Sequence, residues 1–297
     1  MTLTHTTSPA FDLPIVLPAG ETVFAVGDVH GMADHLLRMR ALLRRRASEV
    51  PGPATLVMLG DYIDRGPASV RALTALAEPH AQPGLTERFL IGNHDAMLRA
   101  VLDPTVPAPV RQRNRDRWLF NGGASVLLEL GLADRFPTEI DAITALLREA
   151  LPAEVIGFLN ALEPCAIFGR VILTHGGIHP SVRVEALEHY FAASTDDPGR
   201  DSYHWVRQDF LESRPETRSS ASALAGRFVV HGHTPSVPTL MPHRLGIDTG
   251  CYQTGVLTAV EMTGARARLH HVHPEEVEVP VLRDLLRADV SGGGAGG

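Results

Sequence analysis

Five short segments of this sequence combine glycine with side chains that bind metal ions. They read Gly27-Asp28-Val29-His30-Gly31, Gly60-Asp61-Tyr62-Ile63-Asp64-Arg65-Gly66, Gly92-Asn93-His94-Asp95, His175-Gly176-Gly177 and Gly232-His233. Mixed carboxylate and imidazole donors favour Mn, Fe or Zn over Ca or Mg. The donors are Asp28, His30, Asp61, Asn93, His175 and His233. Such a set is too large for one tetrahedral ion and suits two ions that share a carboxylate, an arrangement used for in-line attack on phosphorus.

Predicted strands come directly before the first three segments. Residues 22–26, 55–59 and 88–91 are apolar and β-branched, and helical spacing follows them at 32–47, at 69–77 and from about residue 96. A repeat of strand and helix about every 30 residues predicts βαβ units and a parallel sheet. The carboxyl ends of parallel strands lie along one edge, so we expect the three segments to meet there.

The remaining chain predicts a helical insert and a second sheet. Residues 97–162 are predicted to be mostly helical and to cover the sheet edge. Further strands are expected at 171–173 and 227–230, a short helix at 203–211, and an antiparallel second sheet at 246–247, 256–261 and 267–271. We divide the chain into a flexible lead-in (1–20), one catalytic domain (21–275) and a C-terminal segment (276–297) that ends in a disordered Gly-rich tail.

Composition limits the partners and the compartment. The net charge of −7 and the pI of about 6.1 give no field that attracts nucleic acid or an anionic membrane. No apolar run approaches the roughly 18 residues of a membrane span. Cys165 and Cys251 lie far apart, which predicts a reducing, cytoplasmic setting without a disulfide framework. The sequence does not determine the oligomeric state.

The five segments match, in order, the motifs GDxHG, GDxxDRG, GNH[DE], HGG and GH. The chain thereby resembles the phosphoprotein phosphatase family of calcineurin-like metallophosphoesterases from about residue 22 to 262. Trp205-Val206-Arg207 and the run His231 to Pro235 are similar to its bacterial and phage serine/threonine phosphatase branch. The resemblance implies an α/β fold, a four-layer α/β/β/α sandwich of two mixed sheets flanked by helices.

The resemblance also implies a role for each motif residue. Asp28, His30 and Asp61 would hold one divalent ion, and Asp61 would bridge to a second ion completed by Asn93, His175 and His233. The ions would be Mn²⁺, with Fe or Zn as alternatives. His94 would be the general acid oriented by Asp64, whereas Arg65, Arg207 and Asn93 would bind the phosphate of the substrate.

Three functions are compatible with these motifs. The first is a serine/threonine protein phosphatase that acts on phosphoproteins or small phosphoesters, and the second is a symmetrical dinucleoside tetraphosphate hydrolase. Members of that second group, as usually described, lack an equivalent of Asp64, which this chain has. The third is a catalytically silent phosphoprotein-binding protein, which predicts eroded ligand positions, and none of the six is eroded.

Other chemically suggestive residues receive plainer interpretations. We interpret His231 as structural, Cys251 as packed, and Arg111, Arg113, Arg115 and Arg117 as a solvated helix face, with a basic rim for acidic phosphopeptides as the alternative. Trp118 and the stretch 121–123 resemble a loop of bacterial members and are candidates for lining the substrate cleft. Asp248-Thr249-Gly250 recurs in that branch, and the sequence assigns it no role.

Overall fold

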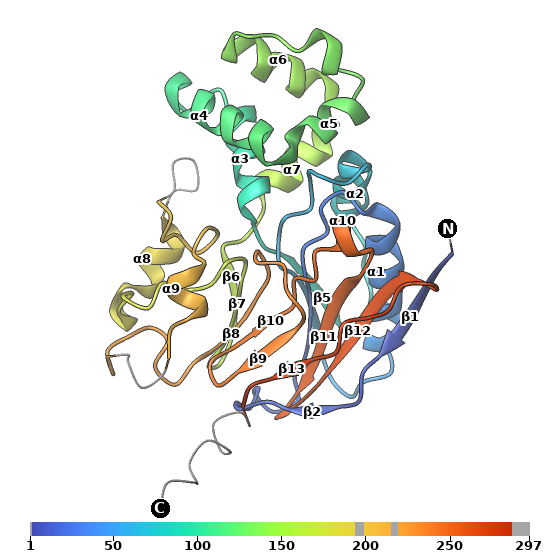
Figure 1. The fold of residues 1–297 in the computed structure, drawn as a ribbon, viewed down its shortest axis with the longest axis vertical. Helices are drawn as coiled ribbons and strands as arrows, with labels where there is room; N and C mark the ends of the chain where they lie inside the picture. The colour runs from blue at the N-terminus through green and yellow to red at the C-terminus, as the bar shows by residue number, and fades with distance from the viewer. Residues whose placement is uncertain (1, 194–198, 215–218, 287–297) are drawn as a thin grey trace, which may run out of the picture.

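Two mixed β-sheets lie face to face, and helices cover their outer faces (Figure 1). The computed structural model describes residues 2–193, 199–214 and 219–286. The order of layers is helix, sheet, sheet, helix, as the family resemblance implies. Within the described ranges, none of the helices combines the length and the apolar character that a membrane crossing requires.

The first sheet has the strand order β1-β12-β11-β3-β4-β5, with β2 paired to β12. Its strands are β1 (Leu3–Thr7), β2 (Phe11–Asp12), β3 (Thr22–Val26), β4 (Ala54–Met58), β5 (Leu85–Phe89), β11 (Leu257–Thr263) and β12 (Arg266–Pro274). Strands β3, β4 and β5 are parallel, as their spacing predicts, and α1 (Ala33–Ala47) and α2 (Ser69–Ala77) connect them. The carboxyl ends of these three strands therefore share one edge.

The second sheet has the strand order β13-β9-β10-β8-β7-β6. Its strands are β6 (Cys165–Phe168), β7 (Val171–Thr174), β8 (Phe228–His231), β9 (Thr239–Met241), β10 (Arg244–Gly246) and β13 (Arg283–Asp284). Strands β7, β8 and β10 are parallel to one another. Helices α8 (Leu187–Ala192) and α9 (Gln208–Leu211) lie beside this sheet (Figure 1), together with the 3-10 turn η3 (Val184–Ala186).

Alternation along the central strands divides the core in two. Val23 and Ala25 of β3 point between the sheets, whereas Phe24 and Val26 of the same strand pack under α1 and α2. Successive strand residues face opposite sides, so one apolar run supplies both cores. A strand that is buried on both faces has a fixed carboxyl end. The residues that directly follow the strand are therefore also held in a fixed position.

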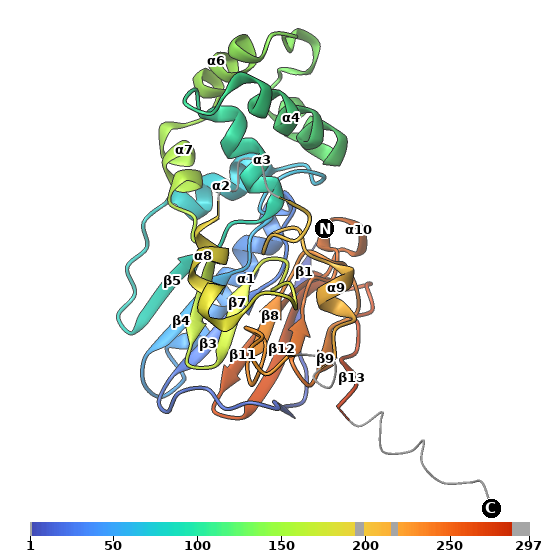
Figure 2. The ribbon, with the colours of Figure 1, turned by 90° about the vertical axis from the view of Figure 1, so that its left-hand side faces the viewer.

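A group of helices lies beyond the carboxyl edge of the sheets (Figures 1 and 2). It comprises α3 (Asn93–Leu102), α4 (Ala108–Trp118), the π-helical turn η1 (Leu119–Gly123), α5 (Ala124–Glu129), the 3-10 turn η2 (Ala133–Arg135), α6 (Ile140–Ala150) and α7 (Ala153–Asn160). The segment predicted to be mostly helical is thus helical in the structure. Its treatment as an insert within a single domain remains a prediction.

Two assignments of strands differ from the predictions. The strands predicted at 256–261 and 267–271 are antiparallel, but they extend the first sheet because β11 pairs with β3. The lead-in 1–20 is not loose: β1 pairs with β12, and Leu13, Ile15 and Leu17 are buried between the sheets. These pairings join segments more than 200 residues apart, and local periodicity does not encode the partner of a strand.

The predicted helix 203–211 is confined to α9, because residues 203–207 turn back onto the site described below. At the other end of the chain, β13 pairs with β9 within the predicted C-terminal segment. The Gly-rich tail at 291–297, predicted to be disordered, lies outside the described residues.

Candidate metal centre and active site

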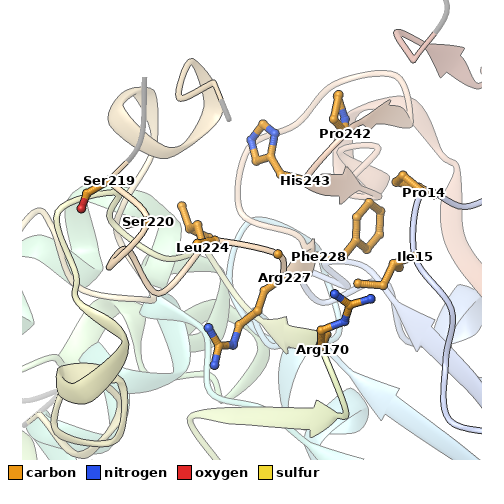
Figure 3. Close-up of a pocket in the computed structure, with 12 residues that line it drawn as sticks. Pro14, Ile15, Arg170, Ser219, Ser220, Leu224, Arg227, Phe228, Pro242 and His243 are labelled. Carbon is orange, nitrogen blue, oxygen red and sulfur yellow. The ribbon is translucent and has the colours of Figure 1, made fainter. Parts of the chain in front are cut away.

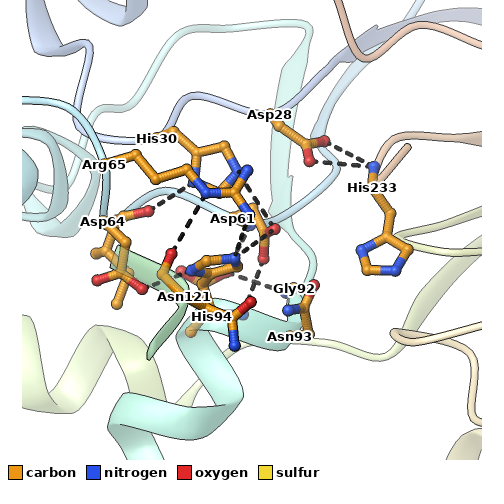
Figure 4. A network of polar contacts seen from close by, with 12 residues as sticks. Asp28, His30, Asp61, Asp64, Arg65, Gly92, Asn93, His94, Asn121 and His233 are labelled. Carbon is orange, nitrogen blue, oxygen red and sulfur yellow. Dashed lines mark hydrogen bonds and ion pairs between the residues drawn. The ribbon is translucent and has the colours of Figure 1, made fainter. Parts of the chain in front are cut away.

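The five glycine-containing segments meet at the carboxyl ends of strands from both sheets, and Figure 4 shows Asp28, Asp61, Asn93 and His233 near one another. Asp28 and His30 follow β3, and Asp61 follows β4. His175 directly follows β7, and His233 lies two residues past β8. The parallel strands of the first sheet bring three segments together, as predicted. The face-to-face stacking of the sheets adds the other two.

The backbone of the site is held in sparsely populated conformations. The described non-glycine residues with positive φ are His30 (45°), Asp61 (52°), Asp64 (73°), Arg65 (68°) and His233 (68°). Every one of them is a predicted site residue. Left-handed conformations at such residues persist only when the surrounding structure imposes them, and they cluster at functional sites.

Glycines allow the segments to approach one another closely. A Cβ atom on Gly92 would lie 2.1 Å from Asp61 Oδ1, and one on Gly232 would lie 2.0 Å from Asp28 Oδ1. Because any other residue would collide with a carboxylate at these two positions, the glycines are needed for the polar groups to converge.

Four donor atoms converge on one side of Asp61. His175 Nε2 lies 3.1 Å from Asn93 Oδ1, 3.2 Å from His233 Nδ1 and 3.3 Å from Asp61 Oδ2. All of these residues are buried. Lone pairs on such atoms repel one another unless a proton or a metal ion lies among them, and the mixture of imidazole, amide and carboxylate fits a transition metal.

Hydrogen bonds behind the imidazoles orient them toward the cluster. His175 Nδ1 bonds the carbonyl of Leu59 at 2.9 Å, and His30 Nδ1 bonds that of Ile63 at 2.8 Å. A ring that donates from Nδ1 presents the lone pair of Nε2 forward, which is the usual arrangement of a metal-binding histidine.

The electrostatics of the cluster also favour positive charge. Burial by itself would lower the pKa of His175, but the carboxylates of Asp61 and Asp28 outweigh it and raise that pKa to about 9. The site stabilises a proton on His175 although the imidazole is completely buried, and such a site attracts cations. The residues of the cluster are therefore suited to binding divalent ions.

The second group of donors surrounds His30. Its Nε2 lies 3.6 Å from Asp61 Oδ2, and His94 joins these two residues in a buried group of potential ligands. Asp28 lies at the same edge, where its two carboxylate oxygens accept the backbone N–H of His233 at 3.1 Å each (Figure 4). The structure thus places every predicted ligand at one site, with Asp61 belonging to both groups.

Arg207 reaches the site from the turn before α9. Its Nε donates to His233 Nε2 at 2.9 Å, so that nitrogen acts as the acceptor and Nδ1 carries the ring proton. A metal ion held by His233 Nδ1 would require the opposite tautomer, so His233 would hold it only without this bond from Arg207.

His94 and Asp64 form a buried pair. His94 Nδ1 lies 2.5 Å from Asp64 Oδ2, and both side chains are almost fully shielded from solvent. Burial raises the pKa of Asp64 well above its usual range and lowers that of His94 to about 4. Both pKa shifts indicate that the pair retains a proton between Asp64 Oδ2 and His94 Nδ1. The other ring nitrogen, His94 Nε2, faces the site.

Trp118 supports this pair through a hydrogen bond to Asp64, a role that the sequence did not predict. Its indole Nε1 donates to Asp64 Oδ1 at 2.8 Å, so both oxygens of Asp64 are bonded. The indole bond favours the carboxylate form and fixes its plane. Trp118 was predicted to line the cleft on the basis of its loop; it is instead fully buried behind Asp64.

Replacing Trp118 with phenylalanine tests this support. The ring would still fill the space beside Gly123, but Asp64 Oδ1 would be a buried acceptor without its donor, which costs about 1–3 kcal/mol. We therefore expect a lower free energy of unfolding in urea and a reduced kcat. An unchanged free energy of unfolding would contradict the role of the indole bond.

Asp95 is a second residue whose position only the structure reveals. Its Oδ2 accepts the backbone N–H of Asp61 at 2.7 Å and that of Gly92 at 3.0 Å, and its Oδ1 accepts that of Tyr62 at 3.1 Å. One carboxylate thus joins the turn after β4 to the start of α3. The Gly-Asn-His-Asp motif contained the signal, but the sequence does not show which backbone groups Asp95 reaches.

Arg65 lies between the two histidines and the helical group. Its NH1 contacts His30 Nε2 at 3.0 Å, and its NH2 contacts His94 Nε2 at 3.1 Å (Figure 4). The carbonyl of Gly122 accepts its backbone N–H at 3.3 Å, and the Tyr252 ring lies 4.9 Å from the guanidinium carbon. Its guanidinium therefore faces the donor group of His30, Asp61 and His94, and a guanidinium in that position can bind an anion such as phosphate.

The prediction that the arginines of α4 form a solvated face is only partly correct. Arg111 is buried, and it donates to the carbonyl of Val106 at 3.0 Å and to Thr144 Oγ1 at 2.8 Å. Arg113 and Arg117 are exposed, as predicted. Arg111 thus connects α4 to α6 and has a structural role. The alternation of arginines with other polar residues in the sequence did not indicate this role.

A separate pocket of about 510 Å³ opens at the opposite end of the second sheet (Figure 3). Two of its lining residues, Arg170 and Arg227, immediately precede β7 and β8. The pocket therefore lies at the amino ends of the strands whose carboxyl ends carry His175 and His233. It contributes no side chain to the candidate site.

Comparisons with known proteins agree with this geometry. The asymmetrical bis(5'-nucleosyl)-tetraphosphatase PrpE of Bacillus velezensis is 27% identical over 283 residues, covering 89% of this chain and 96% of that protein. The symmetrical bis(5'-nucleosyl)-tetraphosphatase of Chromohalobacter salexigens is 25% identical over 281 residues, covering 85% and 98%. The fold is similar to that of the cold-active protein-tyrosine phosphatase of a Shewanella species, with a TM-score of 0.50, 18% identity and coverage of 84% and 80%.

The family model described as calcineurin-like phosphoesterase matches residues 21–255, which include all five segments of the site. That family uses a binuclear divalent metal centre, and the two donor groups that share Asp61 provide candidate ligands for one. The chain therefore belongs to the calcineurin-like phosphoesterases and is a metallophosphoesterase that hydrolyses phosphoesters.

Proposed function

We propose that this phosphoesterase is a phosphomonoesterase of the serine/threonine protein phosphatase type, active on phosphoproteins or small alkyl phosphoesters. The observation that carries the proposal is the buried pair of His94 and Asp64, which Trp118 supports. Such a pair supplies a proton, and the need for a proton depends on the leaving group.

The chemistry of the leaving group distinguishes the candidate substrates. A phosphoserine releases an alkoxide, which is strongly basic and must be protonated as it departs. A dinucleoside tetraphosphate releases a nucleotide through a phosphate oxygen, whose second pKa is about 6 and which departs as an anion. An enzyme for the second reaction gains little from a buried general acid, so the pair favours the first.

Six residues would hold the two divalent ions, for which Mn²⁺ is the expected choice. We assign Asp28, His30 and Asp61 to one ion, and Asp61 with Asn93, His175 and His233 to the other. When bound, the ions neutralise the phosphate and lower the pKa of water to supply a hydroxide near neutral pH. The donor atoms observed in the structure fit this requirement.

The other side chains would act on the substrate itself. Arg65 contacts His30 in one donor group and Arg207 contacts His233 in the other, and both would bind the phosphoryl oxygens, whose charge redistributes during the reaction. The amide of Asn93 can donate to the same phosphate while its oxygen faces the metals. In its protonated form, His94 would give the proton of Nε2 to the departing oxygen, while the Nδ1–H stays bonded to Asp64 Oδ2.

Hydrolysis of dinucleoside tetraphosphates is the second candidate. The relatives that align over most of this chain carry that activity in their names, in both its asymmetrical and its symmetrical form. Nucleotide release would use the same metal centre and arginines, and it would leave the His94–Asp64 pair without an essential task.

A direct comparison of substrates tests the two candidates. The Mn²⁺-loaded protein would be assayed with a phosphoserine peptide and with diadenosine tetraphosphate, and with p-nitrophenyl phosphate as a substrate that shows that the preparation is active. We expect the larger kcat/KM with the phosphopeptide. A clear preference for the dinucleotide would replace the first candidate with the second.

A further inference from the structure

Asp248 lies beside the metal centre, although no motif assigned it a function. Strand β10 is parallel to β8, and Gly246 pairs with His231. Asp248 therefore lies two residues past its strand, just as His233 does. On its other side, a Cβ atom on Gly27 would lie 3.4 Å from the Asp248 Cα atom, so this residue adjoins the turn that carries Asp28.

The carboxylate of Asp248 is buried, and only one of its two oxygens has a hydrogen-bond partner among the described residues. Its relative exposure is 2%, and its Oδ1 accepts the backbone N–H of Gly250 at 2.8 Å. Its Oδ2 is also buried, but it has no hydrogen-bond partner among the described residues. Burying a charged oxygen without a partner is costly, so this atom needs a cation or a hydrogen-bond donor beyond those that the described residues provide.

Asp28, in the turn that Asp248 adjoins, is a second buried acidic residue, with a relative exposure of 2%. Two buried carboxylates next to each other repel when both are ionised, and a divalent ion between or beside them removes that repulsion. The six residues assigned to the centre contribute only two negative charges, those of Asp28 and Asp61, against four positive charges on two divalent ions.

We propose that Asp248 is a positioning carboxylate of the metal centre, whose charge and free Oδ2 strengthen binding of the divalent ion on the Asp28 side. The proposal rests on the metal centre of the proposed function but not on the identity of the substrate. The competing interpretation gives Asp248 only a structural role, in which Oδ1 closes the turn at Gly250.

Replacing Asp248 with asparagine separates these interpretations, because Asn keeps the Oδ1 acceptor for Gly250 and removes the charge. Metal would be stripped with a chelator, and Mn²⁺ binding would be measured by calorimetry without substrate. We expect one of the two sites to bind Mn²⁺ about 10–100-fold more weakly, the usual effect of losing a residue that supports metal ligands. Asp134→Asn, an exposed aspartate in η2, is the matched control and should bind as the unmodified protein does.

Thermal unfolding at pH 8 gives a second readout that does not depend on activity. In the metal-free protein, Asp248→Asn should unfold at the same or a higher temperature, since it removes a buried repulsive charge. The rise in Tm caused by Mn²⁺ should be smaller than in the unmodified protein. A purely structural role predicts an unchanged Mn²⁺ affinity and an unchanged rise in Tm with Mn²⁺, because Asn keeps the bond to Gly250, and that result would overturn the proposal.

Two further outcomes have defined meanings. If Asp248→Asn does not fold, Asp248→Ser, which keeps a smaller oxygen acceptor, replaces it, and an Mn²⁺ affinity within about twofold of the unmodified protein refutes the role of Asp248. If the unmodified protein itself binds no Mn²⁺ or other divalent transition metal, the metal centre of the proposed function fails and the role of Asp248 fails with it.

Discussion

Replacing His94 with asparagine is expected to lower kcat for a phosphoserine peptide by about 10²–10⁴-fold, the usual contribution of a general acid. His94 Nδ1 is held by Asp64 at 2.5 Å, and its Nε2 faces the phosphate site beside Arg65. Asparagine has no group that can give a proton to the departing oxygen. Because His94 lies outside the six residues assigned to the ions, the variant should retain both of them.

The dependence on the leaving group makes this prediction specific. Kinetics would be measured with the phosphopeptide and with p-nitrophenyl phosphate, whose weakly basic leaving group hardly needs an acid. The loss should be much smaller with the aryl substrate. His80→Asn, at an exposed histidine, is the control. Equal losses with both substrates would show that His94 acts on binding or structure and not as the acid.

Replacing Asp61 with asparagine is expected to weaken the binding of both metal ions together. Asp61 Oδ2 lies 3.3 Å from His175 Nε2 in one donor group and 3.6 Å from His30 Nε2 in the other. No other residue belongs to both buried groups in the described part of the chain. Loss of the shared charge should also reduce turnover by at least about 10²–10³-fold, as expected when a main electrostatic contact of the transition state is removed.

Metal analysis after dialysis, together with the EPR signal of bound Mn²⁺, measures this effect directly. The fold should survive, because Asn retains an oxygen for the backbone N–H of His94, which Asp61 Oδ1 accepts at 3.0 Å. Asp134→Asn serves again as the control for loss of an aspartate. Retention of one ion at full occupancy would contradict the bridging role of Asp61.

The metal-binding segments are predictable because their signal is local. Each of the first three directly follows apolar residues, and each contains glycine where the backbone must turn or approach a neighbour closely. The spacing of strands and helices then requires β3, β4 and β5 to be parallel. Parallel strands bring their carboxyl ends together whatever the rest of the chain does, so the strand pattern alone places Asp28, Asp61 and Asn93 at one edge.

The partners of strands distant in sequence are not predictable in the same way. Strands β11 and β12 mix apolar and polar residues and are buried along most of their length, and their sequences are equally compatible with either sheet. Their position beside β3 is decided by which apolar faces pack together in the folded chain. The same reason explains β1, with its threonine-rich sequence, and the two-residue strand β2, because both form an edge only where β12 is present to pair with them.

By itself, the sequence determined the identity and the order of the groups that can bind metals and phosphate, because both are written in short motifs at strand ends. Only the tertiary structure decided what supports them. Trp118 reaches Asp64 from the helical group, Asp95 joins two turns through backbone N–H groups, and Asp248 comes to Asp28 from a strand of the other sheet. These contacts depend on how elements far apart in the chain pack against one another, and no local pattern records that packing.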